Sequence, residues 1–407
     1  MRARATNFAS EDMPAVVAEA HAAGVKVHVT CNILMHDDDI AALPEYFRAL
    51  DAAGVDAFII SDLGAAALAR QVAPRVALHV STQASVANAE AARAWAYLGA
   101  SRIVLAREMS LAQIADMRTR LDESGFADLE LEAFVHGAMC MAVSGRCLIS
   151  SYLTGRSGNA GHCTQPCRWN YDLAVADTEE AFFAVTEEKR PGVFFPIEQD
   201  ARGSYILNAK DLNMLAHLGE LREAGVASVK IEGRNKKALY VATVVNAYRH
   251  VLDGDPAEAW ALELETVSHR PFSTGFFFGD AQQAHDYEGY QQECLHEADV
   301  VACEPAGRNS AFLTVKCHNR FFPGEELEVL APGRPVSRLT VEHLCWLPEN
   351  EDGTFAEPVS VEVANRATDF YRILAPAPVP VGSLLRRREF RRASRVIPPE
   401  TVEPQDR

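Results

Sequence analysis

The sequence lacks the features that mark membrane and secreted proteins. No apolar run approaches the length of a transmembrane helix, and the first eight residues contain no signal-peptide core. The chain has nine cysteines, an odd number that does not suit a fully paired disulfide framework. We therefore predict a protein of the reducing cytoplasm with no membrane partner, in which cysteines bind metal rather than one another.

Common catalytic motifs are also missing. No G-x-G-x-x-G follows an early predicted strand, which weakens the case for a dinucleotide-binding sheet. Neither H-E-x-x-H nor G-x-S-x-G occurs, so the usual signatures of zinc metalloproteases and serine hydrolases are absent. A peptidase with a cysteine nucleophile stays conceivable, because His136 lies close in sequence to Cys140.

Basic residues are outnumbered by acidic ones. Lys and Arg together number 39 against 56 Asp and Glu, which gives a formal net charge of −17. Over the whole chain this balance disfavours nucleic-acid binding, because phosphate contacts require Lys and Arg. One arginine-rich segment departs from the average, and it can be either a solvated tail or a patch that contacts RNA phosphates. Its arginines are Arg386, Arg387, Arg388, Arg391, Arg392 and Arg395.

The first part of the chain alternates between short apolar, β-rich runs and Ala-rich amphipathic stretches. Glycines separate each helical stretch from the next strand, as in Ala23-Gly24-Val25. This short, regular period predicts an α/β protein and favours a (β/α)8 TIM-like barrel over a doubly wound sheet. The predicted strands are Val25–Ile33, Ala57–Asp62, Val76–Gln83, Arg102–Arg107, Leu129–Gly137 and Ser228–Gly233.

Only these six strands are clear, whereas a closed barrel has eight. The stretch Tyr205–Asp211 could supply a seventh, but we interpret Asp211 as the cap of a helix over Leu212–Glu223. The barrel is therefore expected to be incomplete at its N-terminus. We expect the native gene product to be longer at that end.

The composition predicts four segments. Residues 1–252 form the barrel domain, with a cysteine-rich insertion over 138–205, and residues 253–298 form a connector. Short alternating strands separated by Gly and Pro predict a small β-barrel domain over 299–395. Residues 396–407 are expected to be a disordered tail.

Two strands carry the candidate catalytic and binding side chains. Glu132 and His136 share one face of their strand because side chains alternate with a period of two. A carboxylate beside an imidazole can carry out acid–base catalysis, and it can equally be a satisfied core pair.

Lys230, Glu232 and Arg234 repeat this alternation on the last predicted strand. Lys230 and Glu232 can form a structural ion pair, whereas Arg234 at the strand end is suited to bidentate binding of a substrate carboxylate. Active sites of (β/α) barrels lie at the C-terminal ends of the strands. Arg107 and Arg146 could converge on the same mouth, so we favour a site that binds an anionic substrate.

Four cysteines gather in one glycine-rich segment with the spacing C-x6-C-x15-C-x3-C, while the other five are scattered. Four thiolates suit a zinc ion or an iron–sulfur cluster, although the spacing matches no zinc-finger template. Small buried residues in a tight loop are the alternative interpretation. The four are Cys140, Cys147, Cys163 and Cys167.

Several longer motifs resemble those of the peptidase U32, or collagenase-like, family. The resemblance covers nearly the whole chain, although the family normally begins with two further strands. It rests on Glu132–Cys140, Ser144–Ser150, Cys163–Trp169, Leu207–Leu212 and Val229–Arg234.

The resemblance is strongest to family members that modify tRNA. It implies oxygen-independent 5-hydroxylation of the wobble uridine of tRNA, with prephenate as the small-molecule hydroxyl source. It also implies a [4Fe–4S] cluster held by Cys140, Cys147, Cys163 and Cys167, with zinc as the alternative metal. Other possibilities are a peptidase, a ribosomal RNA cytidine hydroxylase, and a non-enzymatic RNA-binding scaffold with a structural metal.

Overall fold

The computed structural model divides the chain into two compact units. The first unit comprises residues 1–235 and 272–285, and the second comprises 236–271 and 286–407. No helix among the described residues is long and apolar enough to span a bilayer. The structure describes residues 7–139, 149–156, 162–166, 171–174, 184–187, 194–196, 199–200, 203–204, 210–234, 236–279 and 292–389.

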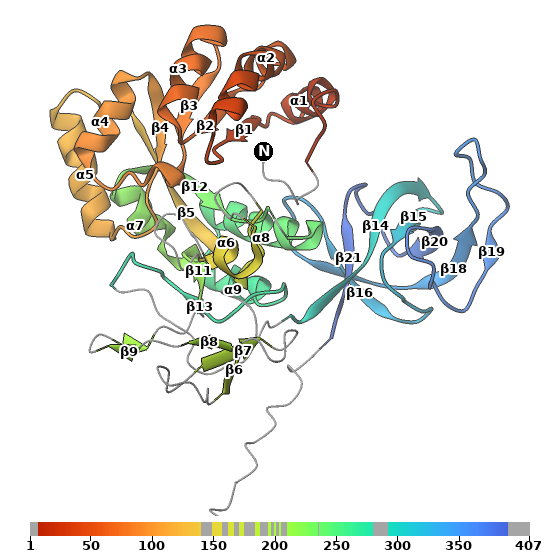
Figure 1. Ribbon diagram of the computed structural model, residues 1–407. Coiled ribbons are helices and arrows are strands. Elements are labelled where there is room, and N and C mark those ends of the chain that lie inside the picture. Colours follow the sequence, from red (N-terminus) through yellow and green to blue (C-terminus); the bar gives the residue numbers. More distant parts are fainter. Residues whose placement is uncertain are drawn as a thin grey trace, which may run out of the picture. The chain divides into compact units, whose positions relative to one another are not determined.

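The first unit is built on a parallel sheet whose strands follow the order of the sequence (Figure 1). All six strands predicted from the sequence are confirmed, with ends that differ by a few residues. Their registers show every neighbouring pair to be parallel. The strands are β1 (His28–Cys31), β2 (Ala57–Ile60), β3 (Ala77–Val80), β4 (Ala100–Val104), β5 (Glu130–Ala138) and β12 (Val226–Ile231).

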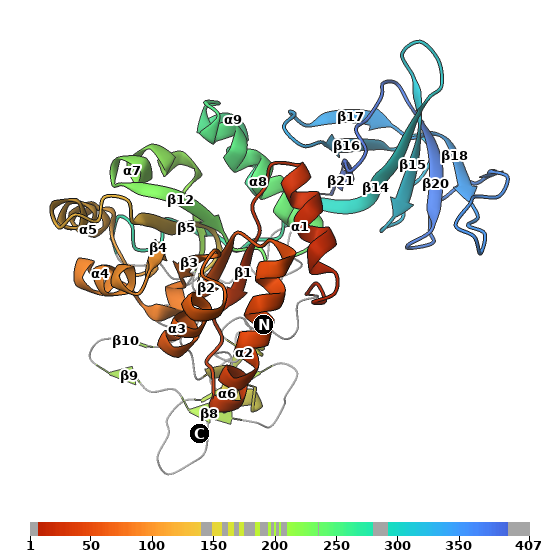
Figure 2. The ribbon, with the colours of Figure 1, turned by 90° about the horizontal axis from the view of Figure 1, so that it is seen from above.

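Helices accompany these strands, and side-chain caps set the starts of α3, α4 and α5. Asp62 and Asn88 each accept a hydrogen bond from the backbone N–H three residues later, and Ser110 forms a capping box with Gln113. Because right-handed crossovers between adjacent parallel strands leave the same side of a sheet, α2–α5 lie along one face (Figure 2). The helices are α1 (Met13–Ala22), α2 (Asp37–Ala53), α3 (Leu63–Val72), α4 (Ala89–Tyr97), α5 (Leu111–Glu123) and α7 (Leu218–Glu223).

The sheet departs from a simple barrel beside β5. The short strand β11 (Asp211–Asn213) pairs antiparallel with the C-terminal part of β5, and β13 (Phe272–Ser273) pairs parallel with β11. The prediction that Asp211 caps a helix is therefore wrong. Asp211 is buried opposite Ala138, and the helix begins only after a 3-10 turn over Leu215–His217.

The chain is mixed α/β with a parallel sheet, as predicted. Among the described residues, β1 pairs only with β2, and β12 pairs only with β5. A closed eight-stranded barrel therefore stays a prediction.

Between β5 and β11 the chain forms several short elements, in the region predicted to be an insertion. Three of its strands form an antiparallel sheet in the order β6-β7-β8, and two more form a separate pair. The elements are α6 (Ile149–Thr154), β6 (Tyr171–Ala174), β7 (Ala184–Glu187), β8 (Phe194–Pro196), β9 (Gln199–Asp200) and β10 (Gly203–Ser204).

The second unit contains two helices and an eight-stranded antiparallel sheet in the order β17-β16-β21-β14-β15-β20-β18-β19. The predicted C-terminal β domain is thus present, curled into half a barrel (Figure 1). Alternate residues of β15 and β20 are buried, as expected for a sheet with one face toward a core. The elements are α8 (Ala238–Leu252), α9 (Ala257–Leu264), β14 (Cys294–Pro305), β15 (Ala311–Cys317), β16 (Glu326–Leu330), β17 (Ser337–Thr340), β18 (Glu342–Leu347), β19 (Val359–Ser360), β20 (Phe370–Ala375) and β21 (Leu384–Arg388).

The division between the units falls at residue 235 rather than at the predicted boundary of 252. Helix α8 belongs to the second unit because its Asn246 binds the turn after β16. The Asn246 side-chain amide donates to the carbonyl oxygen of Arg334 (3.3 Å) and accepts from the N–H of Gly333 (3.1 Å). The predicted connector contains α9 and the start of β14.

Arg386, a buried residue of β21, links α9 and β16 within the second unit. Its side chain is 0% exposed and forms ion pairs with Glu263 on α9 (2.7 Å) and Glu328 on β16 (2.9 Å). It also donates to the hydroxyl of Thr266 (3.0 Å). The prediction that Arg386 contacts RNA is therefore wrong, because the arginine would have to leave two carboxylates to reach a phosphate.

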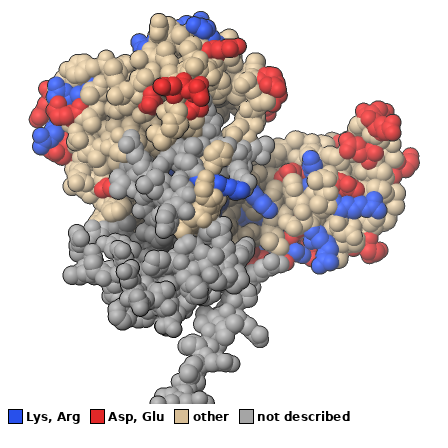
Figure 3. Space-filling model, viewed as in Figure 1, with Lys and Arg blue, Asp and Glu red and all other residues tan. Residues whose placement is uncertain are grey.

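Arg387 and Arg388 are partly exposed and also contact acidic side chains. Arg387 pairs with Glu297, Glu325 and Glu389, and Arg388 pairs with Glu293 and Glu328. On the face shown in Figure 3, basic side chains are interspersed with acidic ones rather than gathered in one patch. RNA contact by Arg387 and Arg388 stays a prediction, and Arg391 and Arg392 lie outside the described residues.

Replacing Arg386 with Leu is expected to destabilise the second unit by about 3–5 kcal/mol, because Glu263 would stay largely buried without its arginine and Glu328 would lose the nearest of its arginine partners. The free energy of urea unfolding measures this change, and hydrogen exchange in β16 and β21 locates it. The matched control is Arg338→Gln, since Arg338 is 63% exposed, pairs with Glu326 at the surface and reaches Glu328 only at 3.8 Å. The control should change stability by less than about 1 kcal/mol. Equal effects of the two substitutions would contradict the role assigned to Arg386.

Candidate functional site

A cluster of charged side chains joins β4, β5 and β12 in the first unit. The carboxylate of Glu132, on β5, accepts hydrogen bonds from Lys230 Nζ (2.8 Å) and Arg102 (3.0 Å). Ser228 Oγ also donates to it at 3.0 Å. Ser228 lies directly opposite Glu132 in the β5–β12 register, so the sheet itself brings these groups together. Arg102 forms a second ion pair with Glu130, at 2.6 Å.

Glu132 is ionised despite its burial. Burial alone would raise the pKa of this carboxyl, but the charge of Lys230 and the hydrogen bonds from Lys230 and Ser228 lower it below the usual 4.5. Arg102 acts in the same direction. A carboxylate held by two cations is a poor proton donor at neutral pH. The arrangement therefore favours a positioning role for Glu132.

Glu132 and His136 are not brought together. The β5–β12 register shifts between Phe134 and His136, so the regular alternation on which the prediction relied is interrupted between Glu132 and His136. Four residues of regular strand would separate the two by about 13 Å. The His136 ring instead lies against Phe272, with 5.4 Å between the ring centroids, and is buried. The proposed acid–base pair is therefore not formed by direct contact.

Two histidines that the sequence analysis missed lie beside the charged cluster. His28 on β1 and His79 on β3 meet edge to face, with 4.8 Å between ring centroids. Burial and the nearby charges of Arg102 and His28 lower the pKa of His79 to about 4. Burial and Arg102 likewise lower the pKa of His28. Both rings are thus kept neutral at pH 7, beside two fixed cations.

The signal for His79 was present but was given no weight. It is the polar residue inside the otherwise apolar strand Ala77–Val80. Polar residues at the strand ends have structural roles instead: Asp62 caps α3, and Asn32 donates to Ser81 Oγ at 2.8 Å.

A second group of charges lies toward the C-terminal end of β5. The guanidinium of Arg107 stacks over the Phe134 ring, 3.8 Å from its centroid, and donates to the carbonyl oxygen of Ala138 (3.0 Å). Arg107 also pairs with Glu232, at the longer distance of 3.5 Å. Lys230 Nζ lies 5.6 Å from the same Phe134 ring. Phe134 therefore has two cations against it, and Lys230 links them to Glu132.

Gly137 allows β12 to come this close to β5. Its φ is +105°, and a Cβ at this position would lie 2.6 Å from the carbonyl oxygen of Glu232. The N–H of Glu232 donates to the carbonyl oxygen of His136 at 2.9 Å. A glycine is required here both by the backbone conformation and by this contact. Arg107 thus lies beside Glu232 and against the ring that Lys230 also approaches, and substrate binding by these residues stays a prediction.

The other predicted binding residues are less well placed. Arg234 is exposed, and its backbone N–H donates to Glu232 (3.3 Å). Arg146 lies outside the described residues.

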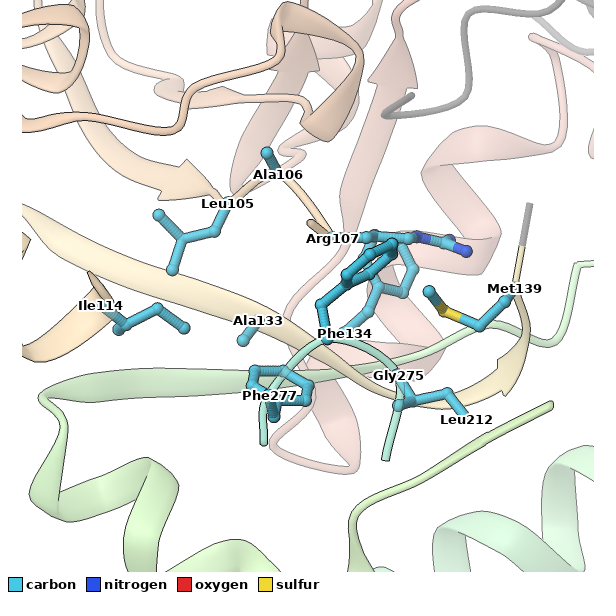
Figure 4. A pocket seen from close by; sticks show the side chains of 11 residues that line it. Leu105, Ala106, Arg107, Ile114, Ala133, Phe134, Met139, Leu212, Gly275 and Phe277 are labelled. Carbon is cyan, nitrogen blue, oxygen red and sulfur yellow. The ribbon is translucent and has the colours of Figure 1, made fainter. Parts of the chain in front are cut away.

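The side chains of Arg107 and Phe134 also border a small hollow of about 10 Å³ (Figure 4). That volume holds about one water molecule, so the hollow is not itself a substrate pocket. Its walls are otherwise apolar: Leu105, Ala106, Ile114, Ala133, Met139, Leu212, Phe276 and Phe277.

Of the four clustered cysteines, the described residues include only Cys163. Its sulfur is exposed and accepts a hydrogen bond from the N–H of Gln165 at 3.4 Å. The adjacent Thr164 is tied to α6, because its N–H donates to Ser150 Oγ (3.0 Å). A sulfur that accepts from a backbone N–H suits a thiolate ligand. The remaining ligands predicted from the sequence, Cys140, Cys147 and Cys167, lie outside the described residues.

His79 should give the first unit a measurable pH dependence. The unfolded chain binds a proton near pH 6.5, whereas folded His79 does so only near pH 4. The contribution of His79 to the free energy of unfolding is therefore fully present above pH 6.5. It falls as the pH is lowered toward 4, by about 3 kcal/mol at most. Urea unfolding at pH 7 and pH 5 should show a smaller loss for His79→Gln than for the wild type. An identical loss in both proteins would show that His79 does not titrate as described.

Comparison with known proteins gives the chain a family. The model of peptidase family U32 matches residues 1–287, and that of the peptidase family U32 C-terminal domain matches residues 298–386. A tRNA hydroxylation protein P of Escherichia coli (strain K12) is 32% identical over 413 residues, which cover 93% of this chain and 87% of that protein. A tRNA hydroxylation protein P1 of Bacillus subtilis (strain 168) is 34% identical, covering 87% of this chain and 80% of the relative.

A third relative carries a different name. An uncharacterized protease of Methanocaldococcus jannaschii is 39% identical over 295 residues, covering 71% of this chain and 68% of that protein. The two family models together match most of the chain. The first covers the parallel sheet of the first unit, and the second covers most of the antiparallel sheet of the second unit. The chain therefore belongs to peptidase family U32.

Proposed function

We propose that this protein hydroxylates tRNA, at C5 of the wobble uridine. The observation that carries the proposal is the extent of the similarity to tRNA hydroxylation proteins. The relatives from Escherichia coli and Bacillus subtilis match 93% and 87% of this chain, so both units are included. Similarity over both units favours a shared substrate more strongly than similarity over one domain would.

The family name suggests a peptidase, but the described residues of the first unit give that reading little support. A cysteine peptidase needs a thiolate near a base. Two cysteines of the first unit are described. Cys31 is buried, and burial raises the pKa of its thiol to about 12, so it is protonated at neutral pH, whereas Cys163 is exposed and is one of the proposed metal ligands. Glu132 is already held by Lys230 and Arg102, and it is not available as a base.

The cations around Phe134 suit an anionic small molecule. Arg107 is bound to Glu232 only loosely, so a substrate carboxylate can replace Glu232 and form two hydrogen bonds to the guanidinium. Lys230, whose Nζ lies 5.6 Å from the same ring, would add a second positive charge. We propose that these residues, with Arg234 and Arg146, bind prephenate, whose two carboxylates match such a site. Glu132 would keep Lys230 in position while the anion binds.

We further propose that Cys140, Cys147, Cys163 and Cys167 hold a [4Fe–4S] cluster, with zinc as the alternative. A bound cluster would supply electron transfer or a Lewis-acidic iron to the reaction. The exposed sulfur of Cys163 and its N–H donor are compatible with this role. Iron and acid-labile sulfide in anaerobically purified protein distinguish a cluster from zinc.

Nucleoside mass spectrometry of tRNA tests the proposed function. A deletion strain should lack 5-hydroxyuridine and its derivatives, and the wild-type gene should restore them. Arg107→Gln should restore at least 10-fold less, because it removes one cation from the proposed substrate site. Arg338→Gln, a surface change in the second unit, should restore the wild-type level.

Two other outcomes would redirect the proposal. Unchanged 5-hydroxyuridine in the deletion strain would contradict tRNA hydroxylation. Loss of a hydroxylated cytidine from ribosomal RNA in the same strain would instead favour the ribosomal reaction.

A further inference from the structure

Three potential metal ligands lie close together in the second unit. They are distant in sequence from the four clustered cysteines, and they offer nitrogen and oxygen atoms rather than sulfur. Asp299 on β14 accepts hydrogen bonds from Nε2 of His296 (2.8 Å) and from Nε2 of His318 (2.7 Å). One potential ligand atom from each of the three residues lies within 4.8 Å of the others. The two imidazole rings face each other, with 4.4 Å between centroids.

The strand is shaped to bring these side chains together. In a regular strand, His296 and Asp299 would point to opposite faces, because they are three residues apart. The register of β14 against β21 shifts between His296 and Ala298, which marks a bulge. Glu297 and Ala298 are both fully buried, so the two residues flanking them return to the same face. Bulges often redirect a side chain at a functional site.

The third ligand is held by backbone contacts. His318 follows the last residue of β15, and its N–H donates to the carbonyl oxygen of Glu297 at 2.7 Å. The next residue, Asn319, donates from its side chain to the carbonyl oxygen of His296, also at 2.7 Å. The loop carrying His318 is therefore fixed to the bulge that carries His296. Such support from outside the ligand set is typical of metal sites.

The chemistry of the three groups suits a divalent transition metal. Two imidazole nitrogens and one carboxylate oxygen are the ligand set of many zinc and non-haem iron sites. The side chains of His296, Asp299 and His318 are 12%, 31% and 35% exposed, which leaves solvent access for a fourth ligand. The N···O distances within the cluster are those of hydrogen bonds. A small movement of the three side chains away from one another would give the spacing that ligand atoms have around one ion.

The charges around the cluster favour a cation. Asp299 supplies a carboxylate that two imidazole nitrogens approach from different segments. Lys316 lies opposite Asp299 in the β14–β15 register, but its Nζ sits against the Phe370 ring, 5.9 Å from the centroid. Arg387 pairs with the buried Glu297 of the bulge.

We propose that His296, Asp299 and His318 form a binding site for a divalent transition-metal ion of the zinc type. The site uses nitrogen and oxygen ligands only, and it is separate from the four cysteines of the first unit. Two of its ligands lie on β14 and the third lies in the loop after β15, so a bound ion would fix these two segments of the second unit to each other.

Zinc binding by the full-length protein tests this site. The protein would be equilibrated with Zn²⁺, dialysed, and analysed for bound zinc per chain, with isothermal titration for affinity. Asp299→Asn and His318→Gln should each lose one equivalent of zinc or bind it at least 10-fold more weakly. All variants keep the same cysteines, so metal held there cancels in the comparison.

The matched control is His343→Asn in the same unit. His343 is exposed and has a φ of +51°, a conformation that asparagine tolerates, and it lies outside the cluster. This variant should bind as much zinc as the wild type. Circular dichroism without metal should confirm that all variants are folded. Equal zinc content and affinity in wild type, Asp299→Asn and His318→Gln would overturn the proposal and leave only a hydrogen-bonded cluster.

Discussion

The buried carboxylate of Glu132 organises the first unit. It faces Lys230, Arg102 and Ser228 on the two strands adjacent to β5, so one anion connects three strands. Breaking a buried ion pair by removing one partner is strongly destabilising, whereas forming it adds little net stability. The interaction is therefore best understood as a constraint on position. It fixes which residues of β4 and β12 face the interior. The rings of His28 and His79 nearby stay neutral because burial and the charge of Arg102 outweigh the opposite effect of Glu132.

That constraint extends to the end of the strands. Lys230, held by Glu132, lies near one side of Phe134, while Arg107 stacks on the ring. Gly137 lets β12 approach β5, which places Glu232 within reach of Arg107. Arg107 and Lys230 are thus held in position, and the carboxylate of Glu232 is bound only loosely to Arg107. A substrate anion can therefore take the place of Glu232. The proposed binding of prephenate depends on this exchange.

The parallel strands could be predicted from the sequence because they are short apolar runs that alternate with helical stretches, several of which end at a glycine. The residues at strand ends were less informative, since a polar side chain there can be a cap, as Asp62 is. Arg386 shows a deeper limit. Six arginines in ten residues suggest a solvated surface, and only the pairing of β21 with β14 and β16 reveals that Arg386 faces two buried carboxylates. Asp211 was misassigned for a similar reason, since its partner Ala138 is distant in sequence.

The central claim is that the charge of Glu132, rather than its shape, supports tRNA hydroxylation. The most direct test is the 5-hydroxyuridine content of tRNA from a deletion strain carrying Glu132→Gln, which keeps the size of the side chain but removes its charge. Glu130→Gln is the matched control, because Glu130 also pairs with Arg102 but is 47% exposed. We expect folded Glu132→Gln protein to restore little 5-hydroxyuridine and the control to restore most of it. Full restoration by Glu132→Gln would contradict the claim.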